Sequence, residues 1–375
     1  TVRAFVEQAA IYILRQAKLP LTCQVMSGGG HFYLLLPNNR STIQILTKTS
    51  QRLDEWSLKT TNGEIRFNLA WSKLSKDNIK RLAQSLEEIH KELRNTTFTP
   101  LKNSLSSGGW LEEEFVREAI EIGENQGICT SCGKRPGDWE KDEENKYICP
   151  VCHKDREIGR ELPNSSGFAL KEASFDSTKR FPFLIGGLLN ERSNSQNPLV
   201  ELVWNYFPEF EDTPVIRSKI ARYIPRKDDG EIKTFEEIAE EARGWKALGV
   251  LKADVDNLGL IFQKGLGDNA SMARIATLSR NLDLFFGNYM EQLICEKFPD
   301  IYIAYSGGDD MLVIGPWDMI IRFAFVLHKR FRDYVSGNPN WGLSAGILIM
   351  HPKTPLLQAV ERAEALLKRS KSGEK

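Results

Sequence analysis

Apolar residues recur with two different periods along this chain, and the periods divide it into three regions. Residues 1–98 are expected to form a helix, two strands around a glycine turn, a loop, a strand over 64–71 and a polar helix over 76–94. Residues 99–240 are less regular and contain loops rich in Asn, Ser and Pro. From residue 241 the pattern sharpens, and it predicts strand 246–256, helix 271–297, hairpin 301–315, helix 317–335, strand 341–350 and helix 355–369.

This order of elements predicts the fold class. A β-α-β-β-α-β succession with helices on one face of the sheet is typical of a ferredoxin-like palm. We therefore expect an α+β fold with a first palm at 1–98, a second palm at 241–375 and a helical linker region at 99–240 between them.

An internal repeat supports the presence of two palms. Pro20, the turn Ser27-Gly28-Gly29 and Pro37 each lie 279 residues before an identical counterpart, and no gap is needed between them. The counterparts are Pro299, Ser306-Gly307-Gly308 and Pro316. We expect a structural duplication. At the same offset the counterpart of strand 246–256 falls ahead of residue 1, so the first palm is expected to lack its opening strand here.

The second glycine turn carries two adjacent acids, Asp309 and Asp310, and a neighbouring apolar strand ends in Asp254-Val255-Asp256. Like charges about 4 Å apart repel by roughly 4 kcal/mol even at an effective dielectric constant near 20. A divalent cation turns this repulsion into coordination, and Mg²⁺ prefers such oxygen ligands. The predicted Mg²⁺ or Mn²⁺ ligands are Asp254, Asp309, Asp310 and the backbone of Val255, with Asp256 as a weaker candidate.

Such a metal site suits nucleotide chemistry. Bound divalent ions activate a 3′-hydroxyl and stabilise departing pyrophosphate, and the glycines at 28, 29, 307 and 308 let a triphosphate approach the backbone closely. Strand alternation favours one of Asp309 and Asp310 as the direct ligand without deciding between them. An ordinary turn with solvated acids is the alternative. The acid positions of the first repeat hold Gly30 and His31, so we expect the first palm to be non-catalytic.

Two Cys-x-x-Cys pairs predict a second kind of metal site. Cys129 and Cys132 are separated by sixteen residues from Cys149 and Cys152, which is the spacing of a structural zinc ribbon over 125–160. Four thiolates leave no open coordination position. This site is therefore expected to stabilise a fold and to take no part in catalysis.

Composition narrows the remaining possibilities. The chain has 50 basic and 50 acidic residues, so it is not a grossly basic nucleic-acid-binding protein. Its apolar runs are too short to cross a bilayer, and paired cysteines of this spacing suit a reducing compartment. We expect a cytoplasmic protein without a membrane partner. Lys371 follows the apolar stripe of the predicted helix 355–369. It is either a solvated residue at the helix end or a contact for phosphate.

The combined motifs resemble one family. Ser306-Gly-Gly-Asp-Asp310, the segment Ala253-Asp-Val-Asp-Asn-Leu-Gly259, the helix Arg274 to Leu282 and the cysteine ribbon with Cys132-Gly-Lys-Arg-Pro136 are similar to the large palm-containing subunit of type III CRISPR effector complexes. The helix segment favours the Csm-type branch over the Cmr-type. The HD nuclease domain and the C-terminal helical domain typical of the family have no match in this sequence, so single-strand DNA cleavage is not expected of this chain.

The resemblance implies an activity, a site and partners. It implies two palms facing each other across two ATP molecules, and synthesis of cyclic oligoadenylates when the complex, assembled on its guide RNA with other subunits, binds target RNA. It implies that Asp254, Asp309 and Asp310 are catalytic metal ligands, that Ser27 and Ser306 lie near the nucleotides, and that Lys371 contacts phosphate. Two alternatives stay open: a diguanylate cyclase, and a scaffold that binds nucleotide and RNA without catalysis.

Overall fold

The structure is a computed structural model of the 375-residue chain. The residues that it describes are 2–28, 30–61, 63–76, 82–102, 105, 126–140, 146–161, 167–172, 185–189, 200–203, 216–219, 221–267 and 271–373.

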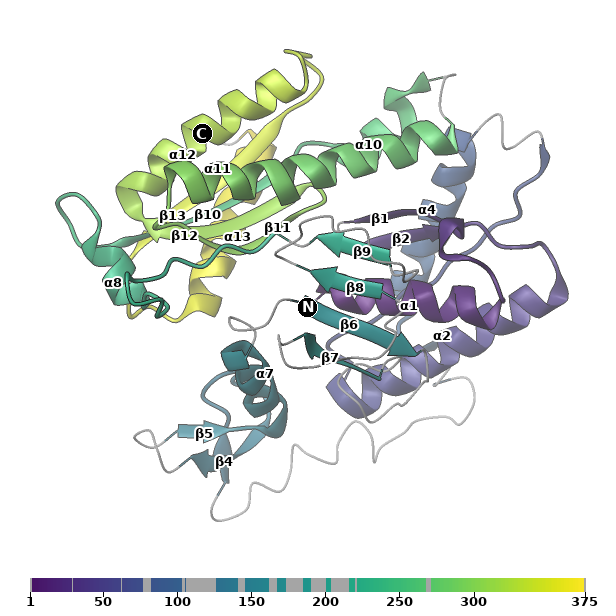
Figure 1. The fold of residues 1–375 in the computed structure, drawn as a ribbon. Helices are drawn as coiled ribbons and strands as arrows, with labels where there is room; N and C mark the ends of the chain where they lie inside the picture. The colour runs from purple at the N-terminus through teal and green to yellow at the C-terminus, as the bar shows by residue number, and fades with distance from the viewer. Residues whose placement is uncertain are drawn as a thin grey trace.

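The most regular part of the chain is a four-stranded antiparallel sheet near the C-terminus (Figure 1). Its strands lie in the order β11-β12-β10-β13, so the hairpin β11–β12 pairs with the first strand and the last strand forms an edge. This is the strand arrangement of a ferredoxin-like palm. The bounds are β10 Leu248–Val255, β11 Tyr302–Gly307, β12 Asp310–Pro316 and β13 Leu343–Met350.

Helices cover both faces of this sheet because side chains alternate along each strand. On β10, Leu251, Ala253 and Val255 pack in the core that contains the helices between β10 and β13. Leu248 and Val250 face the other way and pack with α8 and α13. The prediction of helices on one face was therefore incomplete. The helices are α8 Phe235–Glu240, α9 Leu258–Leu260, α10 Met272–Leu284, α11 Met290–Lys297, α12 Trp317–Tyr334 and α13 Leu356–Ser372, with π-helices η3 Ile261–Gly265 and η5 Phe285–Tyr289.

The N-terminal region contains helix α1 (Val2–Gln16), a short 3₁₀ helix η1 (Leu21–Cys23), and the hairpin of β1 (Gln24–Gly28) and β2 (His31–Leu34). Helices α2 (Arg40–Thr61) and α4 (Leu82–Phe98) follow. Much of the segment predicted as a loop is therefore the 22-residue helix α2.

The predicted strand over 64–71 was wrong, and the repeat explains why. An offset of 279 makes 64–71 the counterpart of β13, whose only neighbour in the sheet is β10. Among the described residues, no strand corresponds to β10 in the first palm. A strand at 64–71 therefore has no such neighbour there to share backbone hydrogen bonds with, and this stretch forms no strand. Phe67 still packs on the rings of Phe5 and Trp56.

The two hairpins confirm the predicted repeat at the level of backbone register. In the first hairpin Ser27 pairs with Phe32, and Gly28 pairs with His31. In the second, Ser306 pairs with Met311, and Gly307 pairs with Asp310, each position shifted by 279. The irregularity between positions 24 and 26 also recurs between 303 and 305. Because bulges are specific backbone features, their coincidence shows one structure used twice.

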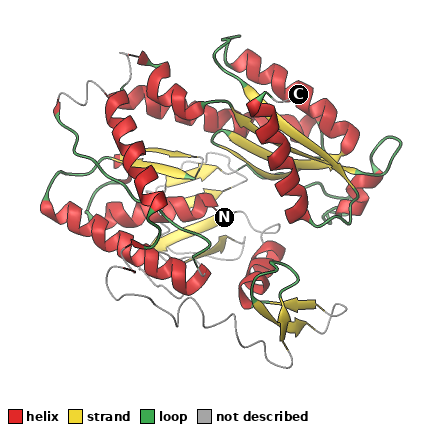
Figure 2. Cartoon of the chain, turned by 180° about the vertical axis from the view of Figure 1, so that it is seen from behind, coloured by secondary structure: helices red, strands yellow, loops and turns green. Residues whose placement is uncertain are grey.

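The region between the palms contains two further sheets. A three-stranded antiparallel sheet of β3 (Gln126–Ile128), β4 (Pro136–Glu140) and β5 (Lys146–Ile148) leads into helix α7 (Pro150–Glu161), and Figure 2 shows this unit set apart from the larger lobes. The prediction that 99–240 is helical was wrong where a second sheet forms. Its strands, in the order β7-β6-β8-β9, are β6 Gly167–Glu172, β7 Ile185–Leu189, β8 Val200–Val203 and β9 Ile216–Lys219.

Helix α10 joins the two palm regions (Figure 1). It contacts β1 of the first hairpin as well as β11 of the second. Leu86 of α4 is buried in the same apolar core as Phe262 of η3, and Met26 and Tyr33 of the first hairpin pack against that core. The described parts of the two palms therefore share a core. Among the described residues, no helix has the length and apolar character needed to cross a membrane.

Candidate functional site

The acidic cluster forms where β10 and β12 meet the glycine turn. Asp254 on β10 pairs directly with Asp310 on β12, so their side chains share one face of the sheet. Asp309 precedes β12, and its backbone oxygen accepts the N–H of Val255 at 3.1 Å. Asp256 lies beyond the end of β10, on the β13 side, where its N–H donates to the oxygen of Gly342 at 2.9 Å. The structure thus brings the predicted acids of two strands together.

Burial and mutual repulsion make these acids unusual. Burial, together with the charges of Asp254 and Asp310, raises the pKa of Asp309 to about 7. Burial likewise raises the pKa of Asp310 to about 6, although the hydroxyl of Tyr305 opposes the shift. Oδ1 of Asp310 and Oδ1 of Asp256 are buried without a hydrogen-bond partner. Buried carboxylate oxygens without donors fit the requirements of Mg²⁺ or Mn²⁺, which bind hard oxygen ligands.

Two lysines bring positive charge to this face of the sheet. Lys371, near the end of α13, contacts Oδ2 of Asp254 through its ammonium group. Lys252 lies two residues before Asp254 on β10, and its charge lowers the pKa of Asp310. Lys371 was among the predicted residues and Lys252 was not. Nothing in the sequence near Lys252 distinguishes it from a solvated strand lysine.

The glycine turn is fixed by contacts that the sequence did not reveal. Gly308 has φ +67°, a conformation that costs little only for glycine, and its N–H donates to Oδ1 of Asp283 at 3.0 Å. The hydroxyl of Tyr305 donates to the oxygen of Gly307 at 3.0 Å. Asp283 lies on α10, 25 residues before the turn. The sequence offered one signal for Asp283: it is an acid on a helix that was predicted from the spacing of its apolar residues.

The two turn serines have equivalent internal partners. Ser306 is 1% exposed, and its hydroxyl donates to the oxygen of Phe286 in η5 at 2.7 Å. Ser27 donates to Oε1 of the buried Glu7 at 2.6 Å. Position 286 is the counterpart of position 7 at the offset of 279. In the structure both hydroxyl groups therefore hold the hairpins on their preceding helices, and their predicted nucleotide contacts stay predictions.

The acid positions of the first palm carry no carboxylate. Gly30 takes φ +78° in the turn, and burial lowers the pKa of His31, which favours the neutral imidazole. Gly28 ends β1, whereas Gly29 lies outside the described residues. The first hairpin thus keeps the shape of the second without its acids.

The four cysteines also come together. One ligand atom from each of Cys129, Cys132, Cys149 and Cys152 lies within 4.8 Å of every other. They are placed by the loop after β3, by the end of β5 and by the first turn of α7. A set of four close sulfur donors fits Zn²⁺.

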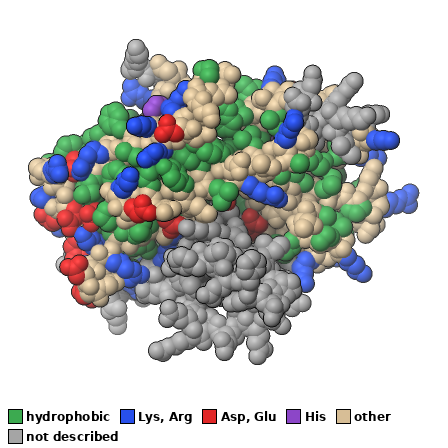
Figure 3. Space-filling model, turned by 45° about the horizontal axis from the view of Figure 1, so that its top comes forward, with side chains coloured by type: hydrophobic (Ala, Val, Ile, Leu, Met, Phe, Trp, Pro, Cys, Tyr) green, Lys and Arg blue, Asp and Glu red, His purple; other side chains and the backbone are tan. Residues whose placement is uncertain are grey.

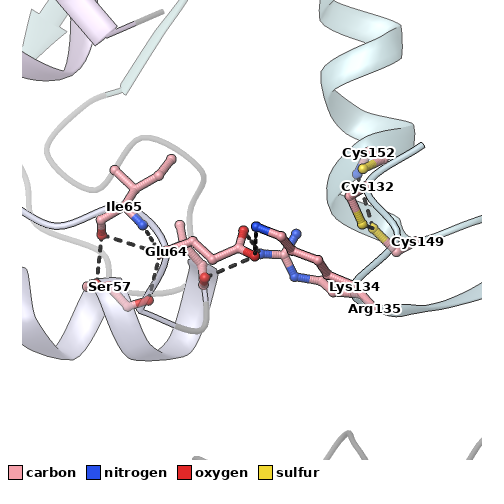
Figure 4. A network of polar contacts seen from close by, with 9 residues as sticks. Ser57, Glu64, Ile65, Cys132, Lys134, Arg135, Cys149 and Cys152 are labelled. Atoms are coloured by element: carbon pink, nitrogen blue, oxygen red, sulfur yellow. Dashed lines mark hydrogen bonds and ion pairs between the residues drawn. The ribbon is translucent and has the colours of Figure 1, made fainter. Parts of the chain in front are cut away.

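The cysteine unit is attached to the first palm by a charged contact (Figure 4). Nη2 of Arg135 donates to Oε2 of Glu64 at 2.7 Å and to the backbone oxygen of Thr61 at 3.2 Å. Lys134 lies 3.2 Å from the other carboxylate oxygen of Glu64. The Arg135 side chain is only 10% exposed, whereas Glu64 is 36% exposed, so the arginine is the shielded partner of this contact.

Two family models match the regions that contain the palms. The model described as Cas10/Cmr2, second palm domain, matches residues 247–375, and the model described as Csm1 subunit domain B matches residues 2–107.

Relatives named CRISPR system single-strand-specific deoxyribonuclease Cas10/Csm1 (subtype III-A) align with nearly all of the chain. The protein from Thermococcus onnurineus is 27% identical over 382 residues, covering 93% of this chain and 47% of the relative. The protein from Methanocaldococcus jannaschii is 27% identical over 420 residues, covering 98% and 51%. The chain therefore spans about half the length of these relatives.

Solved structures share the fold. A structure described as the apo Csm1–Csm4 cassette has a TM-score of 0.76 at 22% identity, covering all of this chain and 49% of that one. The cassette in complex with one ATP has a TM-score of 0.77 at 21% identity, with the same coverage. The two family models match the palm regions in the expected order, and the relatives align along almost the whole sequence. We conclude that the chain belongs to the Cas10 family and is similar to the Csm-type large subunit over about half of that subunit's length.

Proposed function

We propose that this chain binds ATP with Mg²⁺ or Mn²⁺ and joins ATP molecules into cyclic oligoadenylate as part of a type III CRISPR effector complex. The observation that carries the proposal is the acidic cluster itself: Asp254 faces Asp310 across two strands, and Asp309 is fixed beside them by its backbone bond to Val255. Related cassettes have been solved with ATP and with the cyclic tetraadenylate cA4, which supports this choice of substrate and product.

Each group in the site has a role in this proposal. Asp254, Asp309 and Asp310 hold the divalent ions, together with the backbone of Val255, while Asp256 is placed to support them. When bound, such ions activate the attacking hydroxyl and neutralise the triphosphate. Lys371 adds a positive charge for phosphate, and Gly307 and Gly308 leave room for it at the turn. Fixing the reacting groups in one geometry is itself a large contribution to rate.

The first palm is proposed to contribute binding without metal chemistry. Its hairpin has the register of the second, so Ser27 and Gly28 are proposed to serve a second nucleotide, together with Gly29, which lies outside the described residues. The lack of acids at Gly30 and His31 leaves catalysis to the second palm. The turn at Ser306, by the same reasoning, serves the first nucleotide.

We further propose that Zn²⁺ occupies the cysteine cluster and that other effector subunits, guide RNA and target RNA are the partners that control the site. In the space-filling view, the Lys and Arg side chains that are drawn are scattered over the visible face, with acidic ones among them in several places (Figure 3). Activation by RNA is proposed to pass through the assembled complex in the cytoplasm.

Calorimetric titration of ATP with Mn²⁺ tests the proposed site. We expect Asp254→Asn to lose at least tenfold in affinity, because a carboxylate ligand becomes a neutral amide. Asp333→Asn, an exposed acid on α12, is the matched control and should bind as the parent does. Equal heats for the parent and Asp254→Asn would contradict the proposal.

Product analysis separates this function from the two alternatives. The parent chain in its effector complex, given target RNA, Mn²⁺ and either ATP or GTP, is expected to form cyclic oligoadenylate from ATP. The double variant Asp309→Ala/Asp310→Ala should form none. Turnover of GTP alone would indicate a diguanylate cyclase, and ATP binding without any product would indicate a scaffold.

A further inference from the structure

Two ion pairs of opposite polarity link the strand β10 to the helix α13. The strand acid Asp254 contacts the helix base Lys371, and the strand base Lys252 contacts the helix acid Glu364. Lys252 and Asp254 are two residues apart and share one face of the strand. Glu364 and Lys371 are seven residues apart, which is about two helical turns, and share one face of the helix.

The remaining contacts between α13 and the sheet are apolar. Ala359, Ala363 and Leu367 face the sheet; Ala359 and Ala363 pack in one core with Leu248 and Val250. Gly346 lets the helix backbone come close, since a Cβ there would lie 2.4 Å from the oxygen of Ala363. Apolar packing is non-directional, so it fixes the distance of the helix from the sheet better than its position along its own axis.

The ion pair of Lys252 and Glu364 supplies a contact between single charged groups, one on the strand and one on the helix. Both side chains are partly buried, at 25% and 33% exposure, and Lys368 lies 3.5 Å from the other oxygen of Glu364. The pair lies two helical turns before Lys371 on the same helix. A helix held at Glu364 therefore carries Lys371 to a defined place.

From this arrangement we infer that Lys252 and Glu364 are positioning residues, whose ion pair fixes the register of α13 on β10 and so places the Lys371 ammonium beside Asp254. The inference rests on the proposed function of that site, because correct placement of Lys371 is what a bound triphosphate would require. Neither residue is itself assigned a contact with nucleotide.

A double-mutant cycle tests whether the two residues act as one unit. The variants are Lys252→Gln, Glu364→Gln and their combination, and the measurement is the affinity for ATP with Mn²⁺ by calorimetry. Each single variant is expected to bind about two- to fivefold more weakly, which is the range for a partly exposed ion pair. The combination should bind no more weakly than the weaker single variant. Lys252→Arg keeps the pair and should stay within about twofold of the parent.

Two controls separate positioning from general destabilisation. Lys233→Gln breaks another partly buried ion pair, in which Lys233 lies 2.8 Å from Asp300. Asp300 precedes β11, whereas the glycine turn follows β11. This variant should therefore leave the affinity for ATP unchanged. Amide hydrogen exchange without nucleotide should become faster in residues 366–372 of both Lys252→Gln and Glu364→Gln, and should stay at the parent rate there in Lys233→Gln.

Three results would overturn the inference: additive losses in the combined variant, a loss in Lys252→Gln without one in Glu364→Gln, or unchanged exchange in α13. The second would show that Lys252 acts directly on nucleotide or on Asp310. Failure of the proposed function gives a different result, namely ATP binding that is absent in the parent or survives in Asp254→Asn. The exchange measurement then still decides whether the pair fixes the helix.

Discussion

At the scale of single residues, the decisive feature is a buried carboxylate whose pKa is raised. Asp309 and Asp310 have pKa values of about 7 and 6, well above the usual range, because burial disfavours their charged forms. A group whose pKa is higher in the folded protein binds more protons there than in the unfolded chain. Its contribution to stability is complete at low pH and is lost as pH rises through the folded pKa.

This gives a prediction for the protein without divalent ions. Its free energy of unfolding should fall between about pH 4 and pH 7 through these two groups, by several kcal/mol. Mn²⁺ should raise the melting temperature more at pH 8 than at pH 5, because it binds the ionised carboxylates. Scanning calorimetry at both pH values checks this. Divalent ions are removed by gel filtration, since a strong chelator would also act on the cysteine cluster.

The double variant Asp309→Asn/Asp310→Asn is the control for this prediction. It should lose both the decline in stability and the greater effect of Mn²⁺ at high pH, while folding at pH 8 without divalent ions at least as stably as the parent. An equal rise in melting temperature with Mn²⁺ at pH 5 and pH 8 in the parent would show that these acids do not bind the ion.

At the scale of elements, the sequence predicted what local patterns determine. The strands and helices of the second palm appear near their expected positions, and the hairpin register follows from the repeat. Helix α2 was missed because its polar positions, such as Arg40 and Lys59, obscure the apolar stripe that includes Leu46, Leu53 and Trp56. The stretch 64–71 was misjudged because a strand depends on a neighbour, which no local pattern reveals.

The same limit applies to the candidate site. The acids at 254, 309 and 310 were found because two motifs each placed carboxylates at a strand end. Asp283, Lys252 and Glu364 were not found, because their importance lies in contacts with residues 25 to 112 positions away. Such contacts exist only after the chain has folded. Sequence spacing within one helix or strand cannot indicate them.

The contact of the cysteine unit with the first palm leads to a prediction about that element. Arg135 lies between the cysteine loop and Glu64, so Glu64→Gln should weaken the attachment of the unit without removing a thiol ligand. Hydrogen exchange in β3 to β5 should become faster, by a factor that corresponds to about 1–3 kcal/mol for a hydrogen bond to a charged group. Glu157→Gln, on the outer side of α7, is the matched control and should leave exchange there unchanged.

Zinc content shows whether such a change reflects attachment or loss of the metal. Glu64→Gln is expected to keep the metal-to-protein ratio of the parent, because the four sulfur ligands are untouched. If the exchange rate in β3 to β5 stays at the parent value, the contact of Glu64 does not stabilise the attachment, and the unit is held by other groups.

At the scale of the whole molecule, the repeat is used asymmetrically. Both palms keep the same hairpin, but only the second has its acids, and among the described residues only the second hairpin is part of a four-stranded sheet. The first hairpin instead packs against α10 of the other palm, and Leu86 of α4 contributes to the core beside η3. Because the shared core lies next to the glycine turns, the two nucleotide positions proposed here are placed relative to each other by apolar packing.

This shared core predicts that the palms unfold together. Leu86→Ala should destabilise the protein by about 2–5 kcal/mol, the range for a buried Leu, and should speed hydrogen exchange in η3 and α10 of the second palm. Leu53→Ala is the matched control. Leu53 is also a buried leucine, but it packs with Ala9 and Tyr12 in a separate core of the first palm. Its loss should speed exchange in α1 and α2 more than in η3. Equal exchange in η3 for Leu86→Ala and the parent would mean that the contact between the palms carries little free energy, and the two nucleotide positions would then need RNA or another subunit to hold them together.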